Sequence, residues 1–167
     1  WEFFKDYKNK TCIEFGTHKG QTTKILSYCF KHVYTINKDI QSFDNAKMLN
    51  VGIENITYVP FNLYSNGKLD FKDISVFMID AGHQYNQVIS DVNRCLSMSL
   101  LDECYIIFDD YGLNVHAHHV KKAVDEFINS NKIKVVKKIG YEPGHLFGGK
   151  TNRKLNDYEG LICKVVK

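Results

Sequence analysis

Short apolar runs alternate along this chain with longer stretches in which apolar residues recur every three or four positions. The short runs predict strands at residues 11–15, 32–37, 55–60, 74–80, 104–108, 132–139 and 160–166. The stretches between them have the spacing of one helix face, as in Val88, Val92 and Cys95. The fourth run is apolar on both faces until its final carboxylate, which is typical of a central strand in a parallel sheet.

The alternation of strands and helices predicts an α/β fold, a three-layer Rossmann-like doubly wound sheet that is mostly parallel. We expect the last two runs to form a terminal antiparallel strand pair at the sheet edge. We also expect a single domain over residues 1–167, excised from a longer chain because the first residue is Trp1. In such sheets ligands bind beyond the carboxyl ends of the strands, so the residues that close each strand are the candidates for function.

Composition and charge narrow the possible partners. The 22 Lys and Arg against 19 Asp and Glu leave a net charge of +3, too small to hold a phosphate backbone by electrostatics alone, so we expect no nucleic acid. No apolar run approaches the roughly 20 residues of a membrane span, so we expect no membrane. Five widely spaced cysteines without a C-x-x-C pair favour a reducing compartment, the cytoplasm. The oligomeric state is not indicated.

A glycine-containing turn follows the first predicted strand. Residues 14–22 read E-x-G-x-x-x-G-x-T, in which Gly16 and Gly20 allow a sharp turn and the close approach of a ligand. The N–H groups at the start of the next helix favour an anion, so the turn suits a nucleoside-bearing cofactor. The missing middle glycine of G-x-G-x-x-G argues against a dinucleotide. An ordinary strand-to-helix turn explains two glycines about equally well.

Three carboxylates close the two central strands. Asp80 ends the fourth predicted strand, and Asp109 with Asp110 ends the fifth, so these side chains should converge. Converging carboxylates repel one another unless a cation lies between them, and oxygen ligands favour Mg2+. We therefore expect Asp80, Asp109 and Asp110 to bind a divalent metal. The alternative is that Asp80 only holds a cofactor and Asp109 caps the next segment.

These motifs together resemble a known family. The turn after the first strand is similar to the cofactor motif of class I S-adenosylmethionine-dependent methyltransferases. The segments VFMIDAGHQYNQVISDV and YIIFDDYG resemble metal-dependent small-molecule and sugar O-methyltransferases, which carry D-G-D-H-x-Y and D-D-Y motifs. The resemblance covers nearly the whole chain and implies S-adenosylmethionine as cofactor. Its methionine end would be surrounded by Glu14, Gly16, Thr17, Gly20 and Thr22.

The resemblance also implies where the nucleoside of that cofactor lies. After the second strand the family has an acidic residue at the ribose, where this chain has Asn37, with Asp39 two positions on. An amide offers no charge-assisted bond, so either the cofactor is held more weakly or Asp39 reaches in. Asn62, beside Phe61, would lie at the adenine, although a turn asparagine and a loop aromatic explain that pair equally well. Asp80 would also contact the cofactor.

His83 is the candidate catalytic base. It lies three positions after Asp80, where the metal-dependent members of the family carry that group. An imidazole with an ordinary pKa of about 6.5 accepts a proton at neutral pH. The resemblance implies methyl transfer to a hydroxyl of a small molecule, with a sugar or glycan diol favoured and a catechol as the alternative. A second cluster, His116, His118 and His119, would touch substrate or metal, or simply cap the surface.

Two other functions stay open from the sequence. A nicotinamide-dependent oxidoreductase uses a similar sheet, but the missing G-x-G-x-x-G argues against it. A non-catalytic binding module would explain why Asn37 stands where the family has an acidic residue. It would not explain why His83 occurs together with three aspartates at the strand ends. The segment 141–157 would form either a lid or a solvated hairpin tip, and it carries Lys150, Arg153 and Lys154.

Overall fold

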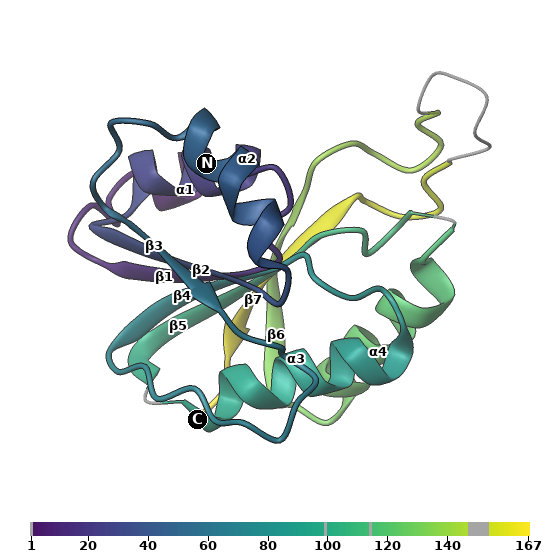
Figure 1. The fold of residues 1–167 in the computed structure, drawn as a ribbon. Helices are drawn as coiled ribbons and strands as arrows, with labels where there is room; N and C mark the ends of the chain where they lie inside the picture. Colours follow the sequence, from purple (N-terminus) through teal and green to yellow (C-terminus); the bar gives the residue numbers. More distant parts are fainter. Residues whose placement is uncertain (1, 99, 114, 147–153) are drawn as a thin grey trace.

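The computed structural model describes residues 2–98, 100–113, 115–146 and 154–167, which form one seven-stranded sheet with helices on both faces (Figure 1). The strand order is β3-β2-β1-β4-β5-β7-β6, and within these residues β7 alone runs antiparallel to its neighbours. The predicted α/β class with a mostly parallel, doubly wound sheet is confirmed. The strands are β1 (Thr11–Phe15), β2 (His32–Asn37), β3 (Ile56–Pro60), β4 (Ile74–Ile79), β5 (Leu100–Phe108), β6 (Ile133–Ile139) and β7 (Gly160–Val165).

The predicted terminal antiparallel pair is confirmed: β6 and β7 pair at the sheet edge, and β7 is the inner strand of the pair. β7 inserts between β5 and β6, so that β6 becomes the edge strand. β7 is buried at all but one position, whereas β6 carries three lysines and is mostly exposed. A strand buried on both faces needs neighbours on both sides, while lysines protect an open edge from pairing with another chain.

β5 is longer than its apolar run indicates. It begins at Leu100, which already pairs with Ile74 of β4. The first half of the strand includes the exposed residues Asp102 and Glu103. Only its second half, from Cys104 onward, is buried in the core. Polar residues at its start therefore conceal the beginning of the strand from a hydrophobicity pattern.

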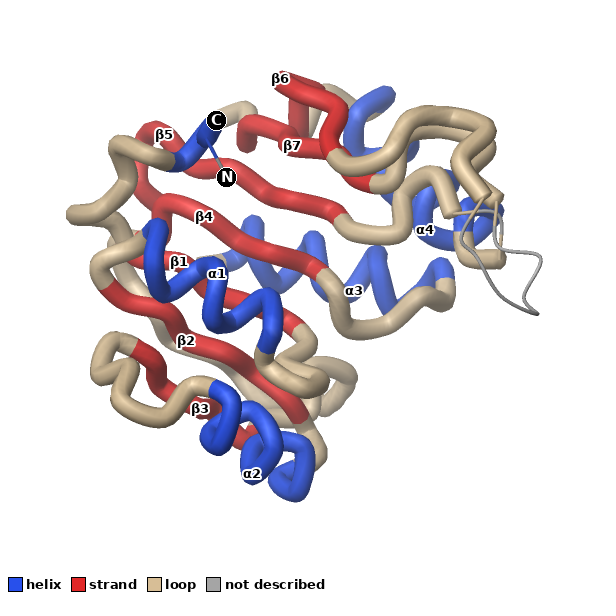
Figure 2. Tube along the Cα trace, turned by 90° about the horizontal axis from the view of Figure 1, so that it is seen from above, coloured by secondary structure: helices blue, strands red, loops and turns tan. Residues whose placement is uncertain are grey.

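Two helices cover each face of the sheet (Figures 1 and 2). Side chains of β5 alternate between the faces, with Ile106 packed toward α3 and α4 and Ile107 toward α1. Both faces are therefore apolar, which explains the unbroken apolar runs of the central strands. No helix in the described ranges has the length and hydropathy that a membrane span requires. The helices are α1 (Gln21–Cys29) and α2 (Ile40–Leu49) on one face, and α3 (Tyr85–Ser97) and α4 (Ala117–Asn129) on the other.

The N-terminal segment closes the α1 face. It forms a single 3-10 turn, η1 (Glu2–Phe4), and its Phe4 side chain is 1% exposed. The Phe4 ring contacts the rings of Phe30 and Tyr105. Burial of such an aromatic side chain supplies much of the apolar contact between this segment and the sheet.

Candidate active site

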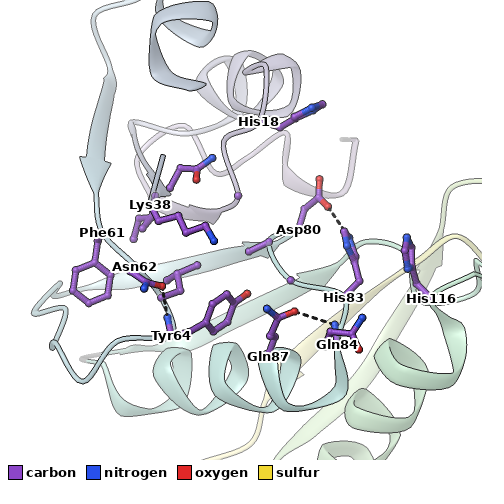
Figure 3. Close-up of a pocket in the computed structure, with 16 residues that line it drawn as sticks. His18, Lys38, Phe61, Asn62, Tyr64, Asp80, His83, Gln84, Gln87 and His116 are labelled. Carbon is purple, nitrogen blue, oxygen red and sulfur yellow. Dashed lines mark hydrogen bonds and ion pairs between the residues drawn. The ribbon is translucent and has the colours of Figure 1, made fainter. Parts of the chain in front are cut away.

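A cavity of about 590 Å3 opens at the carboxyl ends of the first four strands (Figure 3). This volume is in the range of pockets that bind small molecules or cofactors. Its place agrees with the rule that open α/β sheets bind ligands beyond the strand ends. The lining residues include Gly16 and His18 after β1, Asn37 and Lys38 around the end of β2, Phe61 to Tyr64 after β3, Asp80 to Gln84 after β4, and Gln87 and His116.

Four of the eight predicted cofactor residues line this cavity. They are Gly16, Asn37, Asn62 and Asp80, each from a different strand end. The other four, Glu14, Thr17, Gly20 and Thr22, are not among its lining residues. In the turn after β1 the lining residues are Gly16 and His18, so the rest of the predicted motif lies beside or below the cavity.

Both glycines of the turn are required by backbone packing. Gly16 has φ of +100°, and a Cβ there would lie 1.9 Å from the carbonyl oxygen of Asp80. Gly20 caps α1 with φ of +82°, and a Cβ there would lie 2.7 Å from the side chains of Ala46 and Asn50. Gly16 thus lets the turn after β1 approach the end of β4, whereas Gly20 lets α1 approach α2.

Glu14 lies beneath the cavity as a fully buried carboxyl group. Its Oε2 accepts hydrogen bonds from the hydroxyls of Thr23 and Thr35, the latter at 2.6 Å. The hydroxyls of Thr17 and Thr35 lie 2.6 Å apart and extend this network. Burial raises the pKa of Glu14 to about 7 although these hydrogen bonds favour its ionised form. Whether Glu14 also contacts a cofactor stays a prediction.

The end of β2 presents an amide and an amine to the cavity. Asn37 and Lys38 line it, and the side-chain oxygen Oδ1 of Asn37 accepts a bond from the Asp39 N–H at 3.2 Å. Asp39 is the N-cap of α2, where its carboxylate accepts a bond from the Gln41 N–H at 3.0 Å. Capping of this kind is the usual role of an aspartate before a helix. Of the two candidates for the ribose, Asn37 faces the cavity and Asp39 caps the helix.

His83 lies between two of the predicted aspartates, at the rim of the cavity, and Figure 3 shows its ion pair with Asp80. Its Nε2 is 2.8 Å from Oδ2 of Asp110 and 3.7 Å from Oδ1 of Asp80. The carboxylates of Asp110 and then Asp80 raise the pKa of His83 to about 10, although its partial burial opposes the shift. The imidazole is therefore protonated at neutral pH in this structure, in contrast to the neutral ring that its ordinary pKa predicts.

The two aspartates after β5 differ in their contacts. Asp110 has φ of +56°, a left-handed conformation that asparagine and aspartate tolerate better than most residues. The Asp109 carboxylate accepts the Asp110 N–H at 3.0 Å. Asp110 reaches His83, while Asp109 lines a small cavity beside Asp80 and His83 and also a separate cavity of about 490 Å3 with Thr22 and Glu159. Burial and the nearby carboxylates of Asp80 and Asp110 raise the pKa of Asp109 to about 7.

The arrangement of these side chains does not fit a resident Mg2+. Mg2+ requires a near-octahedral set of oxygen ligands. Here the His83 ring nitrogen occupies the space between Asp80 and Asp110, so these two carboxylates approach a ring nitrogen and not a common ion. Nothing in this donor set supports the metal site that the three aspartates predict.

Histidines offer a second possible donor set for a metal. Atoms of His83, Asp110 and His116 lie within 4.8 Å of one another. The rings of His83 and His116 are stacked, with centroids 4.3 Å apart and planes 16° from parallel. A metal ion binds in the plane of an imidazole, so one ion cannot lie in two nearly parallel planes without rotation of a ring. The group is thus a stacked pair next to a carboxylate. His118 and His119 contact each other on α4 and do not line the main cavity.

Several lining residues were given no role by the sequence analysis. His18 lies in the glycine-containing turn after β1 and Lys38 directly follows β2, whereas Tyr64 and Gln87 come from the β3–β4 loop and α3. Position after a strand end would have found the first two. Lys150 and Arg153, predicted to lie in a lid or hairpin tip, fall outside the described residues, whereas Lys154 is exposed and pairs through its backbone with Leu146.

No family model matches the sequence, and no curated protein matches it. Solved structures do match the fold. A putative methyltransferase from Streptococcus mutans, in complex with SAH, is 14% identical with a TM-score of 0.70 over 99% of this chain and 94% of its own. The N-methyltransferase NodS from Bradyrhizobium japonicum, also with SAH, is 12% identical with a TM-score of 0.72 over 95% of this chain and 79% of its own. This chain has a methyltransferase-like fold. At such identities the similarity establishes the fold alone.

A third match corrects one expectation. A putative rRNA methylase from Clostridium thermocellum is 12% identical with a TM-score of 0.68, over 99% of this chain and 94% of its own. The exclusion of nucleic acid as a partner was therefore wrong, since this fold also occurs in proteins described as acting on RNA. A net charge of +3 describes the whole chain and not the surface around one cavity, so it excludes no class of partner.

Proposed function

We propose that this protein is an S-adenosylmethionine-dependent methyltransferase that binds its cofactor in the 590 Å3 cavity. The observation that carries the proposal is the joint presence of Gly16, Asn37, Asn62 and Asp80 around one cavity, each at the end of a different strand. The size and polarity of the cavity fit a nucleoside linked to an amino acid. Matching structures that contain SAH support the same assignment.

The polar groups of the cavity supply a candidate partner for each part of the ligand. Asn37 would bond the ribose hydroxyls and Asn62 would lie at the adenine, as the resemblance implies. Asp80 adds a negative charge that favours the cationic sulfonium end of the ligand. When bound, S-adenosylmethionine supplies an electrophilic methyl group.

We further propose that the acceptor is a hydroxyl and that His83 Nε2 takes its proton. The 2.8 Å contact with Asp110 orients the ring and stabilises the imidazolium that forms. Because its pKa is raised to about 10, His83 is a stronger base than free imidazole but carries a proton at neutral pH. The base-competent fraction of the protein therefore increases with pH. No step in this mechanism requires a metal.

The acceptor class follows only from the resemblance, which favours a vicinal diol of a sugar, with a catechol as the alternative. Isothermal titration with S-adenosylhomocysteine tests the cofactor assignment, and NAD is the matched control for an oxidoreductase. Tritiated methyl transfer to sugars, catechols and RNA then tests the acceptor. Binding of NAD without binding of S-adenosylhomocysteine would replace the proposal with the oxidoreductase.

A further inference from the structure

One arginine holds the loop that forms a wall of the main cavity. Arg94 lies on α3, and its three guanidinium nitrogens donate to three carbonyl oxygens of the loop after β3. Nε bonds Leu63 O at 2.5 Å, Nη1 bonds Gly67 O at 2.8 Å, and Nη2 bonds Ser65 O. The guanidinium also lies 5.3 Å from the centroid of the Phe61 ring. A single planar group thus contacts the first half of the loop, from Phe61 to Gly67.

The held loop is also the part of the chain that lines the cavity. Phe61, Asn62, Leu63 and Tyr64 are lining residues, and the Tyr64 N–H donates to the Asn62 side chain at 3.0 Å (Figure 3). Fixing loop backbone that has no strand or helix partners costs conformational entropy. The three charge-assisted hydrogen bonds from the planar Arg94 guanidinium fix this loop before a ligand binds.

A second contact from α3 supports the same wall. Asp91, one turn before Arg94, is fully buried and accepts a bond from the Tyr64 hydroxyl at 3.3 Å. The Tyr64 hydroxyl in turn occupies the space beside Gly82, where a Cβ would lie 2.2 Å from it. The β3–β4 loop is therefore fixed against both α3 and the segment after β4, each of which also contributes lining residues to the cavity.

We infer that Arg94 is a positioning residue for the nucleoside of the cofactor. It touches no reacting atom, and it acts by keeping Asn62 and its neighbours in the binding geometry. This inference rests on the proposed function, because it requires the cofactor to occupy this cavity. A lysine has the same charge but places all its donors on one nitrogen, so it cannot reproduce the spread of the arginine fork over three separate carbonyl groups.

The variants Arg94→Ala and Arg94→Lys test this role by isothermal titration with S-adenosylhomocysteine. We expect Arg94→Ala to weaken binding roughly 10- to 100-fold through lost preorganisation, and Arg94→Lys to fall between it and the parent. The nucleoside fragment 5′-methylthioadenosine should lose the same factor. Asn93→Ala, an exposed neighbour on α3, is the matched control and should bind like the parent. Equal affinity of the parent and Arg94→Ala would overturn the inference.

A ligand-free measurement separates this inference from the proposed function. Hydrogen exchange of residues 61–67 should accelerate in Arg94→Ala and not in Asn93→Ala, while exchange in β5 and β7 stays unchanged. Ethylguanidinium should slow that exchange in Arg94→Ala by refilling the site. Failure of the parent to bind S-adenosylhomocysteine would overturn the proposed function alone. Unchanged exchange in the loop, or equal acceleration throughout the sheet, would overturn the role of Arg94.

Discussion

The Nε2 atom of His83 lies 2.8 Å from Oδ2 of Asp110, across the crevice between the ends of β4 and β5. The two residues are 27 positions apart in the chain, and the parallel pairing of β4 with β5 brings them together. Asp110 adopts its left-handed conformation at this point, with φ of +56°. Such conformations cluster at functional sites, where the surrounding structure maintains them.

The ion pair of His83 predicts how methyl transfer depends on pH. Asp110 and Asp80 raise the pKa of His83 to about 10, so the base is mostly protonated below that pH and becomes available above it. We expect kcat/KM to rise with pH between about 7 and 10, and His83→Ala to lose this rise together with most of the turnover, by roughly 100-fold or more. A pH profile of initial rates measures both effects.

Asp110→Asn is the companion variant for the pH profile. It removes the first cause of the raised pKa, so the ascending limb should move to lower pH while binding of S-adenosylhomocysteine is retained. A profile that stays in place would assign the titration to another group. Burial raises the pKa of Asp109 to about 7, which makes that carboxyl the next candidate.

Methyl transfer should not depend on a divalent metal. The His83 ring fills the space between Asp80 and Asp110, so these side chains form no oxygen cage. We expect turnover in EDTA to match turnover with added Mg2+, measured after dialysis of the protein against chelator. Loss of activity in EDTA that Mg2+ restores would return the three strand-end aspartates to a metal site, with His83 displaced from between them.

The ribose assignment predicts that Asn37→Asp binds S-adenosylhomocysteine more tightly. A carboxylate at this position would make charge-assisted bonds to two hydroxyls, worth a gain of roughly 10-fold in Kd. Asp39→Asn is the control, because Asp39 caps α2 and asparagine caps equally well. Its affinity should equal that of the parent. An unchanged or weaker Kd in Asn37→Asp would place the ribose elsewhere.

The raised pKa of the buried Glu14 carboxyl predicts that the folded protein loses stability as pH rises. Its pKa in the folded protein is about 7, above the unfolded value of 4.5, so its stabilising contribution is present below 4.5 and is lost as pH rises through 7. Glu14→Gln still accepts from Thr23 and Thr35 but does not ionise. We expect the variant to gain on the order of 2 kcal/mol relative to the parent between pH 5 and pH 8, by urea unfolding. Parallel pH dependence in the two proteins would contradict this account.

Much of the fold follows from hydrophobic periodicity. The predicted strands at 11–15 and 32–37 coincide with β1 and β2, because their apolar runs end at clear turn residues. The place of β7 does not follow, since sequence order says nothing of which strands become neighbours. The start of β5 is hidden by Asp102 and Glu103, which are exposed although they belong to the strand.

The candidate site follows in part from the rule that strand ends carry function. That rule finds Gly16, Asn37, Asn62 and Asp80, which do line the cavity. It cannot decide which way a side chain points after a turn, so it does not separate Asp109 from Asp110. The rule also does not identify Arg94, because its contacts form only when α3 packs against the loop after β3. The direction of the His83 pKa shift likewise depends on distances that the sequence does not contain.

Calorimetric titration of the protein with S-adenosylmethionine, which carries the cationic sulfonium, with Asp80→Asn alongside, tests the central claim most directly. The account predicts saturable binding at one site, weakened in the variant because the cavity loses its carboxylate beside the sulfur end of the ligand. Absence of heat with the folded parent protein, or binding that Asp80→Asn leaves unaltered, would contradict the placement of the cofactor between the ends of β1 and β4.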